Sequence, residues 1–434
     1  MRFLYNLLFL AGFTASAPFY FLKMWRRGNW QRGFSQRFGR YSGKLKQRLT
    51  NRNIIWFHAV SVGEVNLCTQ LIQALERRAP NLKIVVSTTT STGMGELHRK
   101  LPQQIEKIYY PIDAPWMVRG ALRAVHPNAI VLIEAEIWPN FLWQAARRHI
   151  PLFLVNARLS EKSFRGYKRA GFLFRSIFQS FAGVGCQNET DAARLREIGF
   201  APEKIHNFGN LKFDAAQLDH RGFLDVPGLL NQLGVKPGAP IFVAGSTHAG
   251  EESILAKIFL RLRQKFPDLF FVLVPRHFER GKEVGRELEN AGIKFIYRSI
   301  ISTQTRHASG ELECLLVNST GELKSFYEHA TVIFVGKSLS AEGGQNPIEP
   351  GALGKAMVFG PNMQNFAQIA RSFVEKNGAV QVRDATELEK TLAELLADEP
   401  RRKLLGENAL IVVRENLGAI PRTGQRSHGR TRQP

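Results

Sequence analysis

The chain has 434 residues, of which 44% are hydrophobic and 22% charged, an ordinary globular composition that excludes a wholly disordered chain. Its net charge of +22 and its isoelectric point near 10.2 indicate a polyanionic partner, which can be nucleic acid, anionic lipid or a phosphorylated substrate. Three scattered cysteines, Cys68, Cys186 and Cys314, exclude a disulfide framework and a cysteine-rich zinc site, so we expect reduced thiols in a cytosolic environment.

The N-terminal segment is apolar from Phe3 to Leu22 and is surrounded by cations. Eleven Lys and Arg residues precede Glu64, the first acidic residue of the chain. The apolar segment can be a transmembrane helix of about the right length, a signal peptide ending at Ala15-Ser16-Ala17, or an interfacial helix with aromatic residues at both ends. Because a cationic stretch without acids resists translocation, we favour an uncleaved membrane anchor with the rest of the protein in the cytoplasm.

Short apolar strands alternate with helical patterns from residue 54 onward. The first strand is expected at Ile54–Val60, and apolar residues at helical spacing follow Glu64. Such an alternation predicts parallel, doubly wound α/β sheets. The other strands are expected at Ile84–Ser87, Ala129–Ile133, Leu152–Val155, Gly183–Gln187, Pro240–Ala244, Leu269–Val274, Lys294–Tyr297, Leu312–Val317, Val332–Val335, Ala356–Phe359 and Ala379–Val382.

A polar segment that carries Asp, Gly and Pro interrupts this pattern between the two halves. We infer two Rossmann-like domains that face a cleft, with the chemistry on the loops that follow the strands, because open α/β sheets bind ligands there. The predicted parts are an anchor over 1–25, a first domain over 26–215, a linker over 216–238, a second domain over 239–420 and a basic, disordered tail over 421–434.

The motif Ser61-Val62-Gly63-Glu64 places a carboxylate at a strand-to-helix turn. An acid is favoured at the start of a helix by the helix dipole, so Glu64 can be a structural cap. It can also be a general base, since Gly63 allows a ligand to approach closely and cations crowd the region.

The segment Ser87–Gly93 is a hydroxyl-rich loop after the second strand. Such a loop can bind phosphate or sugar, or it can simply cap a helix. Further along the chain, Arg158, Lys162, Arg165 and Arg169 are spaced so that they share one face of a continuous helix. That face can be solvated, or it can meet anionic groups of a ligand.

The second half begins with a comparable strand-to-helix turn, Gly245-Ser246-Thr247-His248, whose helix N-terminus can hold a phosphate. Arg276 follows the next strand and can hold a phosphate through two hydrogen bonds. In Gly343–Pro350, the glycines permit close backbone approach, Pro347 suits a first helical turn, and Glu349 can accept hydrogen bonds from a ribose. The chain contains no DxD triplet, the metal-binding motif of many nucleotide-sugar enzymes.

Together these segments resemble one family, the 3-deoxy-D-manno-oct-2-ulosonic acid (Kdo) transferases of lipopolysaccharide assembly. The resemblance runs from the N-terminal segment to about Gly418. The motifs that carry it are Trp56–Glu64, Ser87–Gly93, Glu134–Asn140, Asn156–Ser160, Gly209–Asp214, Gly245–His248, Val274–His277, Gly321–Leu323 and Gly344–Pro350.

The resemblance implies a GT-B fold and an inverting transfer of Kdo from CMP-Kdo to a lipid A precursor at the cytoplasmic face of the inner membrane, with no cofactor and no metal. It makes Glu64 the proton acceptor. The expected partners are CMP-Kdo, the lipid A precursor and the anionic lipids of the inner membrane, and no nucleic acid. The residues expected to bind the donor are Ser246, Thr247, Pro275, Arg276, Gly321, Glu322, Leu323, Asn346, Pro347, Ile348 and Glu349. The residues expected to bind the acceptor are Ser61, Gly63, Thr92, Gly93, Arg158, Lys162 and Arg165.

Three departures from the family pattern concern Asn318, where the family usually has Asp, Gln345, where it usually has His, and the tail after Ile420. Two other functions stay open at this stage. One is a GT-B transferase or epimerase that uses a UDP-sugar, because a fold does not fix a function. The other is a basic, membrane-bound protein without enzymatic activity, although the cations here lack the interleaved aromatic residues of nucleic-acid binders.

Overall fold

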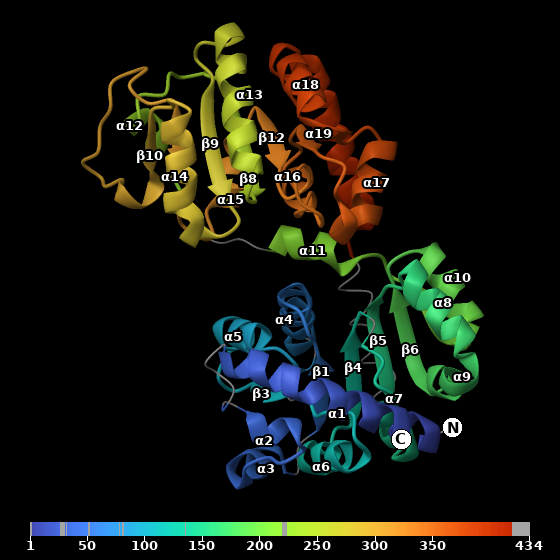
Figure 1. Ribbon diagram of the computed structural model, residues 1–434. Coiled ribbons are helices and arrows are strands. Elements are labelled where there is room, and N and C mark those ends of the chain that lie inside the picture. The colour runs from blue at the N-terminus through green and yellow to red at the C-terminus, as the bar shows by residue number, and fades with distance from the viewer. Residues whose placement is uncertain are drawn as a thin grey trace. The chain divides into compact units, whose positions relative to one another are not determined.

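The computed structural model describes residues 2–26, 31, 33–50, 53–77, 79, 82–134, 136–218 and 224–418. They form two compact units, the first ending at Ala215 and resuming at Leu417, and the second running from Ala216 to Asn416. Each unit contains one parallel sheet with helices packed around it, as Figure 1 shows. The tail predicted over 421–434 lies outside the described residues.

Unit 1 is built on a seven-stranded sheet in the order β3-β2-β1-β4-β5-β6-β7, in which all neighbouring strands are parallel. The predicted α/β class is therefore confirmed for this half. The strands are β1 (Ile54–His58), β2 (Lys83–Thr88), β3 (Glu106–Tyr109), β4 (Ala129–Ile133), β5 (Leu152–Ala157), β6 (Phe181–Cys186) and β7 (Ile205–Asn207).

Helices cover both faces of this sheet, because successive side chains of a strand point to opposite faces. Trp56 belongs to one core cluster and its neighbour Phe57 to another. Helices α3, α6, α7, α9 and α10 contribute to the first cluster, and α4 and α5 to the second. The helices are α1 (Arg2–Arg26), α2 (Phe34–Arg37), α3 (Gly43–Leu49), α4 (Val62–Glu76), α5 (Ser91–Lys100), α6 (Pro115–Val125), α7 (Pro139–Arg147), α8 (Glu161–Arg169), α9 (Gly171–Gln179), α10 (Glu189–Glu197) and the 3₁₀ turn η1 (Pro202–Lys204).

Unit 2 repeats this architecture with the order β10-β11-β9-β8-β12-β13-β14, again with parallel neighbours. Its strands are β8 (Ile241–Thr247), β9 (Phe270–Pro275), β10 (Phe295–Tyr297), β11 (Cys314–Leu316), β12 (Val332–Val335), β13 (Met357–Phe359) and β14 (Val380–Gln381). Its helices are α12 (Val226–Gln232), α13 (Glu251–Lys265), α14 (Gly281–Asn290), α15 (Leu323–His329), α16 (Ile348–Ala352), α17 (Ala367–Glu375), α18 (Ala385–Ala397) and α19 (Glu399–Asn416), with 3₁₀ turns η2 (Phe278–Arg280), η3 (Arg298–Ile300) and η4 (Gln364–Phe366).

The segment predicted as a linker, 216–238, contains regular structure. The last residues of α11 (Leu211–Leu218) and the whole of α12 fall within it. The side chain of Asp225 caps α12 by accepting a hydrogen bond from Gly228 N at 2.9 Å. The polar residues that indicated a linker therefore include a helix cap, which is a common use of Asp before a helix.

The N-terminal apolar segment forms α1, which packs on unit 1 through polar side chains. Tyr5 Oη donates to Asp113 Oδ2 at 2.8 Å, and Asn140 Nδ2 donates to Asn6 Oδ1 at 2.7 Å. The ring of Tyr5 also meets the edge of Trp143, with the centroids 5.6 Å apart. Among the described residues, no helix combines the length and the apolar character needed to cross a membrane.

Asp113 is a buried carboxylate that joins α1 to the start of α7. Besides Tyr5 Oη, it accepts the backbone N–H of Asn140 at 2.9 Å and that of Phe141 at 2.8 Å. These are N–H groups of the first turn of α7, which has no side-chain cap from its own N-cap residue. Burial raises the pKa of Asp113 to about 6, and these hydrogen bonds only partly offset that rise.

Replacing Asp113 by Asn should change how the stability of unit 1 depends on pH. A carboxyl group whose pKa is raised on folding contributes stability that is fully present below its unfolded pKa and is lost as pH rises through the folded value. For a rise from 3.8 to about 6, this loss is about 3 kcal/mol. We therefore expect wild type to lose about that much free energy of unfolding, relative to Asp113→Asn, between pH 3.5 and pH 7.

Tryptophan fluorescence measures this difference cleanly, because all six tryptophans lie before residue 144 and so report on unit 1 alone. Denaturant titrations of both proteins at several pH values give the difference in free energy of unfolding. A difference that does not vary with pH would contradict the assignment of a raised pKa to Asp113.

Candidate active site

Glu64 lies at the carboxyl end of β1, at the start of α4. Its Oε2 accepts from Val60 N at 2.8 Å and its Oε1 from Ser61 N at 3.4 Å, while Ser61 Oγ accepts from Glu64 N at 3.2 Å. This reciprocal pair is a capping box, so Glu64 does cap the helix, as one of the two sequence interpretations predicted. Burial raises the pKa of Glu64, and the nearby carboxylates of Glu134 and Glu136 raise it further. A carboxylate with a raised pKa is a stronger base than an ordinary carboxylate.

Two of the motif residues named for their resemblance, Glu134 and Glu136, follow β4, the strand beside β1. Glu134 adopts a left-handed backbone with φ 62°, and Lys212 Nζ lies 3.7 Å from its Oε1. Glu136 Oε2 accepts from Trp138 Nε1 at 2.9 Å. Sequence reasoning assigned no role to Glu134, Glu136 or Lys212. The detectable signal was a pair of acids directly after a buried strand.

In the hydroxyl-rich loop Ser87–Gly93, two threonine side chains hold the Glu64 turn. Thr88 Oγ1 and Thr90 Oγ1 both donate to Val60 O, at 3.2 and 3.0 Å. A side chain on Gly93 would lie 2.5 Å from Thr88 Oγ1, so this glycine is required by packing. By contrast, a side chain on Gly63 would meet only Ser61 Oγ at 3.8 Å, so the space in front of Gly63 is open to a ligand. Thr92 is exposed.

The predicted row of cations at 158–169 is only partly helical. Ser160 caps α8 by accepting from Ser163 N at 3.1 Å, so the helix begins at Glu161 and Arg158 precedes it. The condition of a continuous helix is therefore not met at Arg158, and only Lys162, Arg165 and Arg169 lie within α8. Arg165 forms an ion pair with Glu161 at 3.0 Å, whereas Lys162 is exposed and has no acidic partner in the described part of the chain.

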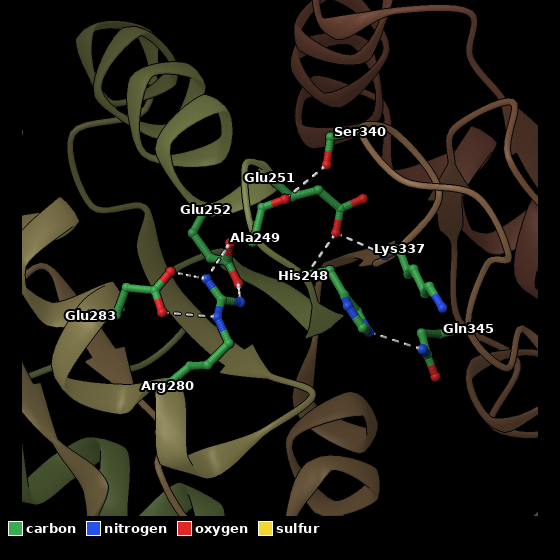
Figure 2. A network of polar contacts seen from close by, with 9 residues as sticks. All are labelled: His248, Ala249, Glu251, Glu252, Arg280, Glu283, Lys337, Ser340 and Gln345. Carbon is green, nitrogen blue, oxygen red and sulfur yellow. Dashed lines mark hydrogen bonds and ion pairs between the residues drawn. The ribbon is translucent and has the colours of Figure 1, made fainter. Parts of the chain in front are cut away.

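The carboxyl edge of the unit 2 sheet is organised by Glu251, which is fully buried at the start of α13. Its Oε2 accepts the backbone N–H of His248 at 3.0 Å and of Lys337 at 2.7 Å. Its Oε1 accepts the backbone N–H of Ser338 and of Leu339, both at 2.9 Å. Figure 2 shows how this one carboxylate joins the loop after β8 to the loop after β12. Sequence reasoning did not identify Glu251.

Positive groups gather around these two loops. Burial and the charges of Lys337, His277, Arg280 and Arg276 together lower the pKa of His248 to about 4, so His248 is neutral at pH 7. Arg280 is held by ion pairs with Glu252 at 2.7 Å and Glu283 at 2.9 Å (Figure 2). Within the described residues, Arg276 and Lys337 form no ion pair. Two cations without acidic partners therefore remain available for an anionic ligand.

The backbone at this edge is held in unusual conformations. Ser246 has φ 56° and Lys337 has φ 54°, which for side chains other than Gly costs about 1–3 kcal/mol each. A side chain on Gly343, which has φ 128°, would lie 3.2 Å from Lys337 Nζ. Such strain clusters at ligand-binding sites, where it positions backbone and side chains before the ligand arrives.

The remaining predicted donor residues lie on neighbouring loops of the same unit. Asn346 Nδ2 donates to Glu349 Oε1 at 3.0 Å, and Pro347 stands at the N-cap of α16, one position before the expected first turn. Glu322 is the N-cap of α15, with Gly321 before it at φ 89° and Leu323 as the first helical residue, and it pairs with Arg298 at 2.8 Å. Thr247 is buried at the end of β8, Pro275 ends β9, and Ile348 is buried in α16.

The two departures that lie in the described chain both make local contacts. Asn318 Oδ1 accepts from Ser299 N at 3.0 Å while its Nδ2 donates to Ser299 Oγ at 2.8 Å, so both ends of the amide hold the η3 turn. Gln345 Nε2 lies 3.4 Å from His248 Nε2 (Figure 2). Among the described residues, no group of three or more His, Cys, Asp or Glu side chains is placed to hold a metal ion.

Comparison with known proteins gives the family. The model of the 3-deoxy-D-manno-octulosonic-acid transferase (kdotransferase) family matches residues 32–215. A 3-deoxy-D-manno-octulosonic acid transferase of Haemophilus influenzae is 33% identical, over 85% of each chain. The fold is similar to that of a glycosyltransferase from Rickettsia africae, with a TM-score of 0.56 at 12% identity over 88% of this chain and 99% of that chain.

A putative UDP-N-acetylglucosamine 2-epimerase from Listeria monocytogenes has the same fold, with a TM-score of 0.57 at 12% identity, over 87% of this chain and 98% of that one. At such low identity these two structures show only the fold. It consists of two parallel-sheet α/β domains, as in GT-B enzymes. The Haemophilus relative, by contrast, is similar in sequence over most of both chains, which shows the family as well as the fold. The chain belongs to the 3-deoxy-D-manno-octulosonic acid transferase family.

Proposed function

We propose that this protein transfers Kdo from CMP-Kdo to a lipid A precursor, with inversion at the anomeric carbon and Glu64 as the base. The observation that carries the proposal is the Glu64 carboxylate: it is fixed by the capping box, its pKa is raised by burial, and Gly63 beside it is open. In the proposed step, a hydroxyl of the acceptor loses its proton to Glu64 as its oxygen bonds to the anomeric carbon. The bond from that carbon to the phosphate of CMP breaks, and CMP leaves with the bonding pair.

Glu134 and Lys212 extend the proposed site in unit 1. The charge of Glu134 adds to the rise in the Glu64 pKa, while Lys212 lies 3.7 Å from the Glu134 carboxylate and limits the local negative charge. We infer that Glu134 keeps the Glu64 pKa high enough for proton transfer and that its carboxylate faces the positive charge that develops on the sugar.

The proposed role of Glu134 predicts how its replacement changes both the stability of unit 1 and the rate of transfer. Glu134→Gly removes the carboxylate from a left-handed position that glycine adopts without strain. We expect the free energy of unfolding of unit 1, followed by tryptophan fluorescence, to stay constant or to rise by about 1 kcal/mol. Transfer should fall by at least about tenfold. A variant that is both destabilised and fully active would contradict a functional origin for this strained conformation.

The donor is proposed to bind at the carboxyl edge of the unit 2 sheet. An octulosonic acid carried by CMP has two anionic groups, a phosphate and a carboxylate. They match the cations Arg276 and Lys337, which form no ion pair with any residue that the structure describes. Glu349 and Asn346, joined by a 3.0 Å hydrogen bond, are proposed to receive the ribose hydroxyls. Charge stabilisation by Arg276, Lys337 and backbone N–H groups would let CMP depart without a metal. We expect transfer to persist in the presence of EDTA.

The proposed acceptor lies in a bilayer, and α1 is proposed to hold the protein at the cytoplasmic face of the inner membrane. Several large apolar side chains of α1 are exposed, among them Phe3, Leu8 and Phe19, each more than 60% exposed. The same N-terminal region carries many cations, which are attracted to an anionic membrane surface.

Nucleotide binding tests the donor assignment against a UDP-sugar. A ligand that binds only the folded protein raises its unfolding temperature. We expect CMP to raise it and UDP to leave it unchanged in the same buffer. Stabilisation by UDP alone would contradict the CMP-Kdo proposal and favour a UDP-sugar enzyme.

A further inference from the structure

An apolar groove lies between α1 and the segment Ile112–Met117 of unit 1. It has a volume of about 260 Å³, and Phe3, Leu7 and Leu10 line it from the α1 side. Trp116, at the start of α6, lines the other side and is 62% exposed. We call this feature the α1 groove. Large apolar side chains gathered and exposed in this way mark an interaction surface.

A cluster of arginines lies beside the α1 groove, on α6 and at the end of α7. Trp116, Arg119 and Arg123 have the spacing i, i+3, i+7 on α6, and all three are exposed. Arg147 and Arg148 are exposed at the end of α7, which packs beside α6 through a 2.5 Å hydrogen bond from Gln144 Nε2 to Pro115 O. We call Arg119, Arg123, Arg147 and Arg148 the arginine patch.

The arginine patch gathers four cations from α6 and the end of the neighbouring helix α7. In the part of the chain that the structure describes, none of its four side chains forms an ion pair. Arg119 and Arg123 lie one turn apart on α6, and the hydrogen bond from Gln144 to Pro115 holds the end of α7 against this helix. In keeping with this arrangement, burial and the charges of Arg119, Arg123 and Arg147 lower the pKa of Arg148. Cations gathered without acids attract an anion with several acceptor oxygens, such as a phosphate.

The two features form one amphipathic surface. Trp116 and Arg123 are seven residues apart on α6, which corresponds to about 10 Å along a helix. The arginine patch therefore begins within about two helical turns of the α1 groove. Because a nucleic acid would use the arginines but leave the groove of Phe and Leu side chains empty, the combination favours a ligand with both a phosphate and a hydrocarbon chain.

We propose that this surface binds an anionic phospholipid of the membrane, with its phosphate on the arginine patch and an acyl chain in the α1 groove. This deepens the proposed membrane attachment and rests on it, but it involves no step of Kdo transfer. Bound lipid would fix which face of unit 1 lies on the bilayer. A solvent-exposed helix face with no ligand is the alternative.

The full-length protein, purified in detergent, tests this by sedimentation with vesicles after dilution of the detergent. One set of vesicles contains neutral phosphatidylcholine, and the other contains one-third phosphatidylglycerol. We expect wild type to bind the anionic vesicles at least about tenfold more tightly. The double variant Arg119→Glu/Arg123→Glu should lose this preference, whereas binding to neutral vesicles should change less than twofold.

The matched control reverses two exposed cations with the same i, i+4 spacing on a helix of unit 2, Lys282→Glu/Arg286→Glu. This control should keep most of the preference for anionic vesicles, although both variants change the net charge equally. Trp116→Ser should weaken binding to both kinds of vesicle, while Leu404→Ser, which changes an exposed apolar residue of α19, should not.

Three results would overturn the proposal. The first is an unchanged preference of Arg119→Glu/Arg123→Glu for anionic vesicles, and the second is an equal loss of that preference in both double variants. The third is that Arg119→Glu/Arg123→Glu loses binding to duplex DNA but keeps its binding to anionic vesicles. The last result would assign the arginine patch to nucleic acid. Transfer measured in detergent micelles with a dispersed acceptor is an independent readout, so failure here can be told apart from failure of the proposed transferase activity.

Discussion

Replacing Glu64 by Gln should lower the rate of Kdo transfer by about a thousandfold while leaving CMP binding unchanged. General bases contribute roughly 10²- to 10⁴-fold to rates, and Gln cannot take up the proton. Gln can, however, still accept the hydrogen bond from Val60 N that the Glu64 carboxylate accepts at 2.8 Å. This substitution therefore removes the proposed base and largely preserves the helix cap.

Ser61→Ala is the matched control, because it removes the other half of the capping box and leaves the carboxylate in place. We expect it to cost about 1 kcal/mol of stability in unit 1 and to lower transfer less than tenfold. If Ser61→Ala and Glu64→Gln lowered transfer equally, the loss would come from a disturbed helix cap rather than from the missing base. Near-normal transfer by Glu64→Gln would remove Glu64 from the role of base.

The pH profile of transfer gives a second readout of Glu64. A base must be deprotonated, so transfer should fall as pH decreases through its pKa. Since burial raises the pKa of Glu64, this decrease should begin above the range of an ordinary carboxyl group. Glu134→Gly removes one of the neighbouring charges that contribute to the rise, so its profile should be displaced to lower pH.

Replacing Glu251 by Gln should destabilise unit 2 by about 3 kcal/mol or more and abolish CMP binding. Each oxygen of the Glu251 carboxylate accepts two backbone N–H groups. An amide has only one oxygen, so its NH₂ group would face two N–H donors, and hydrogen bonds to a charged group contribute about 1.5–3 kcal/mol each. The loops that carry His248 and Lys337 would separate as a result.

Hydrogen exchange measures this effect locally, in peptides that cover residues 245–251 and 336–345. Tryptophan fluorescence reports on unit 1 and should show an unchanged transition. Glu283→Gln is the matched control, because it makes the same chemical change at an exposed member of the network in Figure 2 and should shift stability by less than about 0.5 kcal/mol. Normal CMP binding by Glu251→Gln would contradict the assignment of this sheet edge to the donor.

The sequence pattern predicted the central strands of both sheets because each of them contains an apolar run of four or more residues. The predicted strands Ala129–Ile133 and Val332–Val335 are observed with the same bounds. The two strands that were missed are β3, which begins with Glu-Lys, and β7, which has three residues; both stand at sheet edges. After its charged start, β3 offers only Ile108 and Tyr109, and β7 is three residues long, so neither strand has the apolar run that identifies a buried strand.

Site residues could be predicted where their role depends on local sequence. Ser61 and Glu64 form a capping box over four residues, and this pattern is visible in the chain. Glu251 could not be found in this way, because three of its four N–H donors lie 86 to 88 residues further along the chain. The same holds for Lys212, whose approach to Glu134 depends on the packing of α11 and on a left-handed backbone conformation.

Conversion of a lipid A precursor by the detergent-extracted protein, with CMP-Kdo generated in the reaction, tests the central claim most directly. Mass spectrometry of the lipid product should show a gain of one or more Kdo units with wild type and no gain with Glu64→Gln. An unchanged lipid mass with wild type, in a preparation that still binds CMP, would contradict the proposed acceptor and the proposed reaction.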